Sequence, residues 1–157
     1  MTQILLSLFN SIEVFLNLAV IYSVCNYTVA SGGDGKMARI LVVDDEQMIG
    51  EIASRILKRA GHQVITALSG NEALNLLMSD ASTIDVLLID ETMPGLSARE
   101  TIREILQKQP NVRTIVSSGY KVDYESYAKE FGNSLTALPK PYRSEQLTQA
   151  VANSLAP

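Results

Sequence analysis

The chain has 157 residues, of which 46% are apolar and 19% are charged, and its formal net charge at pH 7 is -4. These values suit one domain of ordinary size with a hydrophobic core, plus a shorter additional segment. The acidic balance argues against a nucleic-acid-binding surface, because contacts to phosphates need a basic face. The single cysteine, Cys25, excludes an internal disulfide, and a reducing compartment is the simplest expectation.

The segment of residues 4–24 consists mainly of Ile, Leu, Val and Phe, and it is about as long as a membrane-spanning helix. No Lys or Arg precedes it, which argues against a signal peptide, and Glu13 near its middle would cost roughly 2–3 kcal/mol at the centre of a bilayer. We expect an apolar helix within residues 1–28, outside the globular domain. Three interpretations stay open: membrane association, binding of a partner or a second copy, and a leader translated from a wrongly assigned start.

Residues 29–36 include the stretch "ASGGDGK", whose composition is typical of a flexible linker. The sequence that follows, "MARILVVDD", starts at Met37 and has the character of a domain beginning. We therefore expect a globular domain over residues 37–157.

From residue 39 onward, short apolar strands alternate with segments of helical periodicity. The five predicted strands cover residues 40–43, 64–67, 86–89, 114–117 and 135–138. Five β–α units in series predict an α/β fold with a doubly wound, five-stranded parallel sheet and helices on both faces. The first and third strands are almost entirely apolar, as expected for strands covered on both sides.

The helices between these strands carry recognisable start and stop signals. Apolar residues at helical spacing between Ile49 and Ala60 predict a first helix that ends at Gly61. Two further helices are predicted to begin with capping boxes, and the second of them to stop at Pro110. Ser144 is the expected N-cap of a last helix. The two boxes pair Ser69 with Glu72 and Ser97 with Glu100.

Polar and charged side chains follow four of the five strands. In open parallel sheets, sites form beyond the carboxyl ends of the strands, so we expect these residues to meet at one edge. In chain order they are Asp44 and Asp45, Asp90, Ser118 with Gly119, and Lys140 with Pro141. An isolated acidic pair after a strand is often only a solvated cap, and Asp45 alone would suit a helix cap. Three carboxylates around one lysine carry excess negative charge, which favours a hard divalent cation with oxygen ligands, Mg²⁺.

Residues from about Met37 to the end resemble the receiver domain of two-component response regulators. The residues that carry the resemblance lie in "ILVVDDE", in "VLLIDETMPG", in "IVSSGY" and in "LPKPY", and their order and spacing match that family. The last two motifs are similar to those of receivers attached to hybrid histidine kinases. The resemblance implies a flavodoxin-like sheet with strand order 2-1-3-4-5.

The resemblance also implies a role for each site residue. Asp90 would accept a phosphoryl group from a phosphohistidine on a sensor histidine kinase or a histidine phosphotransfer protein. Asp45, Asp90 and the backbone carbonyl of Thr92 would bind Mg²⁺ directly, and Asp44 would bind it through water. Lys140 would pair with a phosphoryl oxygen.

The Ser118 hydroxyl would turn toward the phosphoryl group, and the Lys140–Pro141 bond would be cis. The chain departs from the family pattern at Ala137, where an aromatic residue often couples to this hydroxyl. We take it as a hypothesis that Tyr120 or Tyr142 reports the phosphorylation state instead.

The chain ends one helix after Lys140, so we expect a cytoplasmic, stand-alone receiver that binds no nucleic acid. Its target would bind the face formed by the fourth helix, fifth strand and fifth helix, and residues 4–24 would provide any membrane contact. Its only catalysis would be its own phosphotransfer and autodephosphorylation.

The same set of residues admits two alternative functions. The first is a phosphate sink that drains a shared kinase. The second is a phosphatase of the haloacid dehalogenase type. That class places its nucleophile after the first strand with a second carboxylate two residues on, whereas Asp44 and Asp45 are adjacent and Asp90 follows the third strand.

Overall fold

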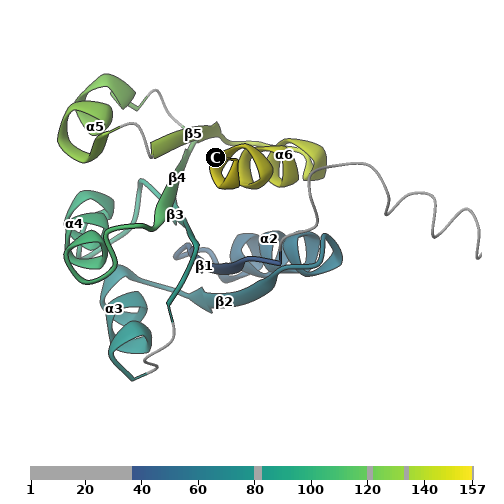
Figure 1. The fold of residues 1–157 in the computed structure, drawn as a ribbon, viewed down its shortest axis with the longest axis horizontal. Coiled ribbons are helices and arrows are strands. Elements are labelled where there is room, and N and C mark those ends of the chain that lie inside the picture. Colours follow the sequence, from purple (N-terminus) through teal and green to yellow (C-terminus); the bar gives the residue numbers. More distant parts are fainter. Residues whose placement is uncertain (1–36, 80–82, 120–121, 133–134, 157) are drawn as a thin grey trace, which may run out of the picture. The chain divides into compact units, whose positions relative to one another are not determined.

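The computed structural model describes residues 37–79, 83–119, 122–132 and 135–156 (Figure 1). The predicted apolar helix and linker fall in residues 1–36 and so lie outside the described residues. No helix in the described part is long and apolar enough to cross a membrane.

Five parallel strands form one sheet in the order β2-β1-β3-β4-β5, which confirms the predicted architecture. The strands are β1 (Arg39–Val43), β2 (Gln63–Ala67), β3 (Val86–Asp90), β4 (Arg113–Ser118) and β5 (Leu135–Pro139). Between and after them run the helices α2 (Gln47–Arg59), α3 (Gly70–Ser79), α4 (Ala98–Lys108), α5 (Tyr124–Phe131) and α6 (Ser144–Leu155). Each predicted strand lies within an observed one.

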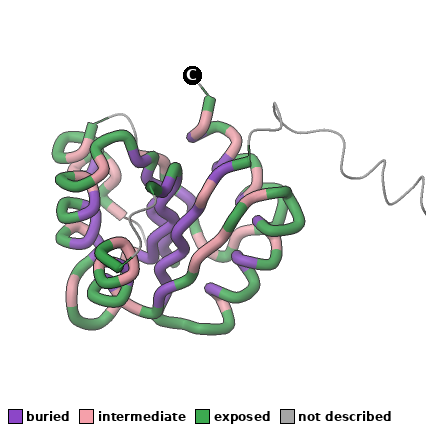
Figure 2. The backbone as a smooth tube through the Cα atoms, turned by 60° about the horizontal axis from the view of Figure 1, so that its bottom comes forward, coloured by how far each residue is buried: buried purple, intermediate pink, exposed green. Residues whose placement is uncertain are grey.

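The helices cover both faces of the sheet, with α2 and α6 on one face and α3, α4 and α5 on the other (Figure 1). Successive strand residues point to opposite faces, so Leu41 and Val43 join the core under α3, α4 and α5, while Ile40 and Val42 join the core under α2 and α6. β3 is therefore buried along its whole length, and β1 and β4 are buried except at their first residues, Arg39 and Arg113 (Figure 2). This double cover explains why β1 and β3 are continuous apolar runs.

Of the three predicted helix starts, one is confirmed, one differs in a detail, and one is wrong. Ser97 and Glu100 form a complete capping box at the start of α4. Ser69 accepts a hydrogen bond from the backbone N–H of Glu72, but the Glu72 carboxylate accepts from the backbone of Leu68. At α6 the predicted N-cap is wrong. Arg143 holds that position, because the Gln146 side chain accepts its backbone N–H at 2.8 Å, so Ser144 is already helical.

The start of α5 was not predicted. Asp123 is its N-cap, and the Asp123 carboxylate accepts the backbone N–H of Ser126 at 3.0 Å. The predicted ends of α2 and α4 are confirmed, since α2 stops before Gly61, which has a φ of 92°, and α4 stops before Pro110.

His62 joins the turn after α2 to the start of β1. Its Nδ1 accepts the backbone N–H of Ala38 at 3.3 Å, which requires a neutral ring, and burial lowers the pKa of His62 below 6.5. Protonation therefore costs more in the folded state than in the unfolded state. The stabilisation is complete above the unfolded pKa of 6.5 and is lost as the pH falls through the folded pKa.

We expect the free energy of unfolding to fall as the pH drops below about 6.5, and to fall only slightly, because the ring is only partly buried. His62→Asn keeps an acceptor for the Ala38 N–H but does not titrate, so this variant should show a flatter profile. Urea unfolding at each pH measures both proteins. Identical pH profiles would contradict the assignment.

Candidate functional site

The acidic residues predicted from the sequence meet at the carboxyl edge of the sheet. Val43 pairs with Ile89 in the β1–β3 register, so Asp44 and Asp90 follow at the same level on neighbouring strands. The Asp44 N–H donates to the carbonyl of Ala67 at 3.1 Å, which extends the pairing of β1 with β2 by one residue. The sheet itself therefore fixes the position of both carboxylates.

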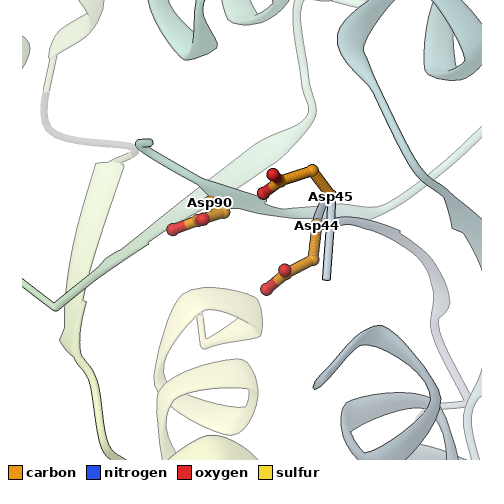
Figure 3. A group of neighbouring side chains, drawn as sticks. All are labelled: Asp44, Asp45 and Asp90. Atoms are coloured by element: carbon orange, nitrogen blue, oxygen red, sulfur yellow. The ribbon is translucent and has the colours of Figure 1, made fainter. Parts of the chain in front are cut away.

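Three carboxylates form one cluster at this edge (Figure 3). Each of Asp44, Asp45 and Asp90 offers an oxygen atom, and these atoms lie within 4.8 Å of one another. Asp44 is 4% exposed and Asp90 is 6% exposed, whereas Asp45 faces solvent. The N-cap of α2 is Glu46, whose backbone N–H donates to the Asp44 carboxylate at 3.0 Å. Asp45 is therefore not the cap of this helix.

Lys140 supplies the positive charge at the centre of the cluster. Its Nζ lies 2.7 Å from Asp44 Oδ2 and 3.2 Å from Asp90 Oδ1. The Lys140 backbone N–H donates to the carbonyl of Ser118 at 2.8 Å, and the bond to Pro141 is cis, as expected. Lys140 and Ser118 thus leave neighbouring strands at the same level, and Ser118 is 1% exposed.

Burial and neighbouring charges determine the pKa shifts of Asp90 and Lys140. Burial raises the pKa of Asp90; the Lys140 ammonium opposes this, and the charge of Asp44 adds to it. A hydrogen bond from the Thr92 backbone N–H to Asp90 acts in the same direction as the ammonium. Burial disfavours the Lys140 ammonium, but the hydrogen bond and charge of Asp44 and then the charge of Asp90 outweigh it, so the pKa of Lys140 is raised. Lys140 therefore stays charged.

The cluster fits a hard divalent cation. Its donors are all carboxylate oxygens, and the Lys140 ammonium pairs with the carboxylates of Asp44 and Asp90, so three negative charges face one positive charge. Mg²⁺ prefers oxygen ligands and commonly engages one or two carboxylates while keeping several waters. Asp45 is the member that stays open to solvent, which gives a cation access to the site.

Two aromatic residues were candidates to report the state of the site. Tyr120 lies outside the described residues. Tyr142 packs against the core under α2 and α6, and burial raises its pKa. Ala137, the departure from the family pattern, is exposed on β5. Asp44 was predicted to bind the metal through water. Its hydrogen-bonded ion pair with Lys140, the shorter of the two ion pairs of this lysine at 2.7 Å, was not predicted.

A family model described as the response regulator receiver domain matches residues 40–152. The chain therefore belongs to the response regulator receiver family. This family is a group of signalling domains in two-component systems and not of conventional enzymes, which rules out the alternative of a haloacid dehalogenase phosphatase.

Similar proteins include sporulation initiation phosphotransferase F of Bacillus subtilis, which is 28% identical over 118 residues, 74% of this chain and 93% of that protein. Sensor kinase CckA of Brucella abortus is 30% identical over 118 residues, 75% of this chain but 12% of the kinase. The chain thus spans only a small part of that relative, and the expected likeness to receivers of hybrid histidine kinases is confirmed.

Among solved structures, the response regulator TrrA of Thermotoga maritima, in complex with Mg²⁺ and a beryllium fluoride, is 32% identical with a TM-score of 0.65. The match covers 76% of this chain and all (100%) of that one. A similar protein thus carries Mg²⁺, in agreement with the chemistry of the acidic cluster.

Removing one carboxylate should weaken Mg²⁺ binding. We expect Asp45→Asn to lower the affinity about tenfold, because one negative charge is lost next to the cation. Isothermal titration calorimetry at neutral pH measures this change. The matched control is Asp85→Asn, because Asp85 is an exposed acid at the opposite edge of the sheet. Equal Mg²⁺ affinity of the two variants would argue against a metal site at the cluster.

Proposed function

We propose that this receiver domain takes a phosphoryl group from a phosphohistidine onto Asp90 and that the modification changes a protein-binding surface. The donor would be a sensor histidine kinase or a histidine phosphotransfer protein. The observation that carries the proposal is the buried Asp90 carboxylate, 3.2 Å from the Lys140 ammonium and within a cluster of three acids. Membership of the receiver family supports it.

The reaction is a displacement at phosphorus. An Asp90 carboxylate oxygen forms the new bond to phosphorus as the bond from phosphorus to the donor imidazole nitrogen breaks, and the electron pair stays on that nitrogen. Lys140, already beside Asp90, would pair with one phosphoryl oxygen, and the Ser118 hydroxyl would donate to another. Catalysis in such transfers comes mainly from positioning and neutralisation of charge.

Asp45, Asp90 and the Thr92 backbone carbonyl would hold Mg²⁺, with Asp44 acting through a water molecule. When bound, Mg²⁺ supplies positive charge that offsets the repulsion between the carboxylates and the incoming phosphoryl group. The all-oxygen donor set and the Mg²⁺ in the TrrA structure support this assignment.

The target-binding surface would be the face formed by α5, β5 and α6, the fourth helix, fifth strand and fifth helix of the domain. Phosphorylation would shift the populations of two forms of this face. A short-lived aspartyl phosphate would instead favour the phosphate sink.

We further propose a cytoplasmic receiver domain over residues 37–157, preceded by a linker over residues 29–36 and an apolar segment over residues 1–28. The choice among membrane contact through residues 4–24, partner binding and a wrongly assigned start stays a prediction. Intact mass of the native protein reports its true N-terminus and tests the last alternative.

The phosphodonor would dock against α2. This helix begins two residues after Asp45, and it exposes two large apolar side chains one turn apart, Met48 at 74% and Ile52 at 50%. Exposed apolar residues beside a reactive site are typical of protein contacts. A helix carrying the phosphohistidine would bury both of them as it approaches Asp90.

Asp90→Asn should abolish phosphorylation. Incubated with acetyl phosphate and Mg²⁺, the wild-type protein should gain the mass of one phosphoryl group, because this small donor reaches the site without docking to a protein surface. Intact mass spectrometry detects the gain, and Asp85→Asn serves as the folded control that keeps it. Uptake by Asp90→Asn would move the phosphoacceptor elsewhere, and a wild-type protein that takes up no phosphate would overturn the proposal.

Truncating both apolar residues on α2 separates docking from chemistry. The double variant Met48→Ala, Ile52→Ala should accept phosphate at least about tenfold more slowly from an autophosphorylated histidine kinase that phosphorylates the wild type, since each buried apolar side chain contributes about 1.5 kcal/mol or more. Its uptake from acetyl phosphate should not change. Met78→Ala is the control, because Met78 is 70% exposed on α3. Equal losses with both donors would contradict docking at α2.

A further inference from the structure

A cluster of charged and aromatic side chains joins α4 to α5. Arg99, the second residue of α4, donates from Nη1 to the Glu130 carboxylate at 2.7 Å and from Nη2 to the Ser126 hydroxyl at 2.9 Å. Its guanidinium also lies 3.9 Å from the centroid of the Tyr127 ring. Arg103, one turn further along α4, binds the second oxygen of Glu130. We call Arg99, Arg103, Tyr127 and Glu130 the clamp.

The clamp differs in kind from an ordinary surface ion pair. The side chains of Arg99 and Glu130 are 31% and 30% exposed, and one carboxylate receives two guanidinium groups. By contrast, the pair of Arg55 and Glu51 on α2 is 3.7 Å long with side chains 75% and 50% exposed. Exposed pairs contribute little, whereas partly buried charge-assisted hydrogen bonds with a cation–π contact contribute more. The clamp therefore fixes α5 against α4.

Tyr127 connects the clamp to the interior. It is 2% exposed and belongs to the same core cluster as Val116 of β4 and Ile89 of β3. Burial raises the pKa of Tyr127 to about 12, and the charge of Glu91, the residue after Asp90, adds to the effect. The ring is therefore neutral at physiological pH, and it lies close enough to the phosphoacceptor strand to sense the charge of Glu91.

The clamp connects two helices that follow different strands of the sheet. β4 ends at Ser118, whose hydroxyl would turn toward the phosphoryl group, and α5, which begins at Tyr124, is the next element along the chain. Arg99 and Arg103 belong to a different helix, which follows β3 (Figure 1). Contacts between α4 and α5 must strain or break if α5 moves alone. In the structure, where Lys140 is bonded to both Asp44 and Asp90, these contacts are intact.

We propose that the clamp is a lock that holds α5 in the unphosphorylated form and opens when Asp90 is phosphorylated. This inference rests on the proposed function. A contact present in one form only lowers the population of the other form, so its removal must raise the affinity for any ligand that selects the second form. Weakening the clamp should thus favour the phosphorylated form without any change in the residues at Asp90.

The test measures binding of beryllofluoride, a phosphoryl mimic, to the full chain by calorimetry at saturating Mg²⁺. Glu130→Gln keeps the size of the side chain but removes the charge that binds both arginines. It should bind beryllofluoride about fivefold more tightly than the wild type, which is the lower range of coupling between two sites. Glu51→Gln is the matched control, because it breaks an arginine pair on α2 and should leave the affinity unchanged.

A second measurement uses the wild type alone, so it does not depend on the folding of a variant. Nuclear magnetic resonance should show the Arg99 side-chain N–H signals and the Tyr127 ring signals shifting when Mg²⁺ and beryllofluoride are added. Unmoved signals, or equal affinities of Glu130→Gln and Glu51→Gln, would overturn the lock while leaving the proposed function intact. A wild-type protein that binds no beryllofluoride would overturn both.

Discussion

The contact of Lys140 with two buried carboxylates is the interaction on which the site depends. Asp44 and Asp90 are almost fully buried, and two like charges at this distance from each other are unfavourable without a cation. The Lys140 ammonium compensates one of the two negative charges of Asp44 and Asp90. The second of these charges and the charge of Asp45 remain uncompensated. An excess of negative charge at an edge that keeps one carboxylate open to solvent favours the binding of a divalent cation.

Parallel pairing is what brings these residues together from distant parts of the chain. The β1–β3 register sets Asp44 level with Asp90, and the β4–β5 register places Ser118 beside Pro139, the residue before Lys140. Since all strands run the same way, every group after a strand lies on the same edge. The cluster therefore needs no long loop to position it, and the buried strands hold its geometry.

The five strands and the cluster could be predicted because both follow from local patterns, whereas the order of the strands followed from the resemblance to receiver domains. The apolar runs predicted the positions of the strands, and the polar or charged residues after these runs predicted the members of the site. Ser144 was assigned wrongly because serine, a good N-cap, stands next to Arg143, and only the Gln146 side chain decides between them. Arg99 and Glu130 carry no local signal, since they are 31 residues apart and of types common on exposed helix faces. Gly70 is similar: a Cβ there would lie 2.1 Å from the Thr101 hydroxyl oxygen, a contact between helices that no local pattern reveals.

The absence of an aromatic residue in β5 gives the clamp its place in the mechanism. In β5, Leu135 packs against the core under α3, α4 and α5 and Ala137 is exposed, and the large ring buried in that core comes from Tyr127 of α5 itself. A ring on β5 could rotate while α5 stays in place. The Tyr127 ring is carried by α5 itself, and the Arg99 guanidinium of α4 lies 3.9 Å from the centroid of this ring. In the proposed lock, coupling between Asp90 and the α5 face would run through side chains that join α5 to its neighbours, and these include the ion pairs of Glu130 with Arg99 and Arg103 of α4.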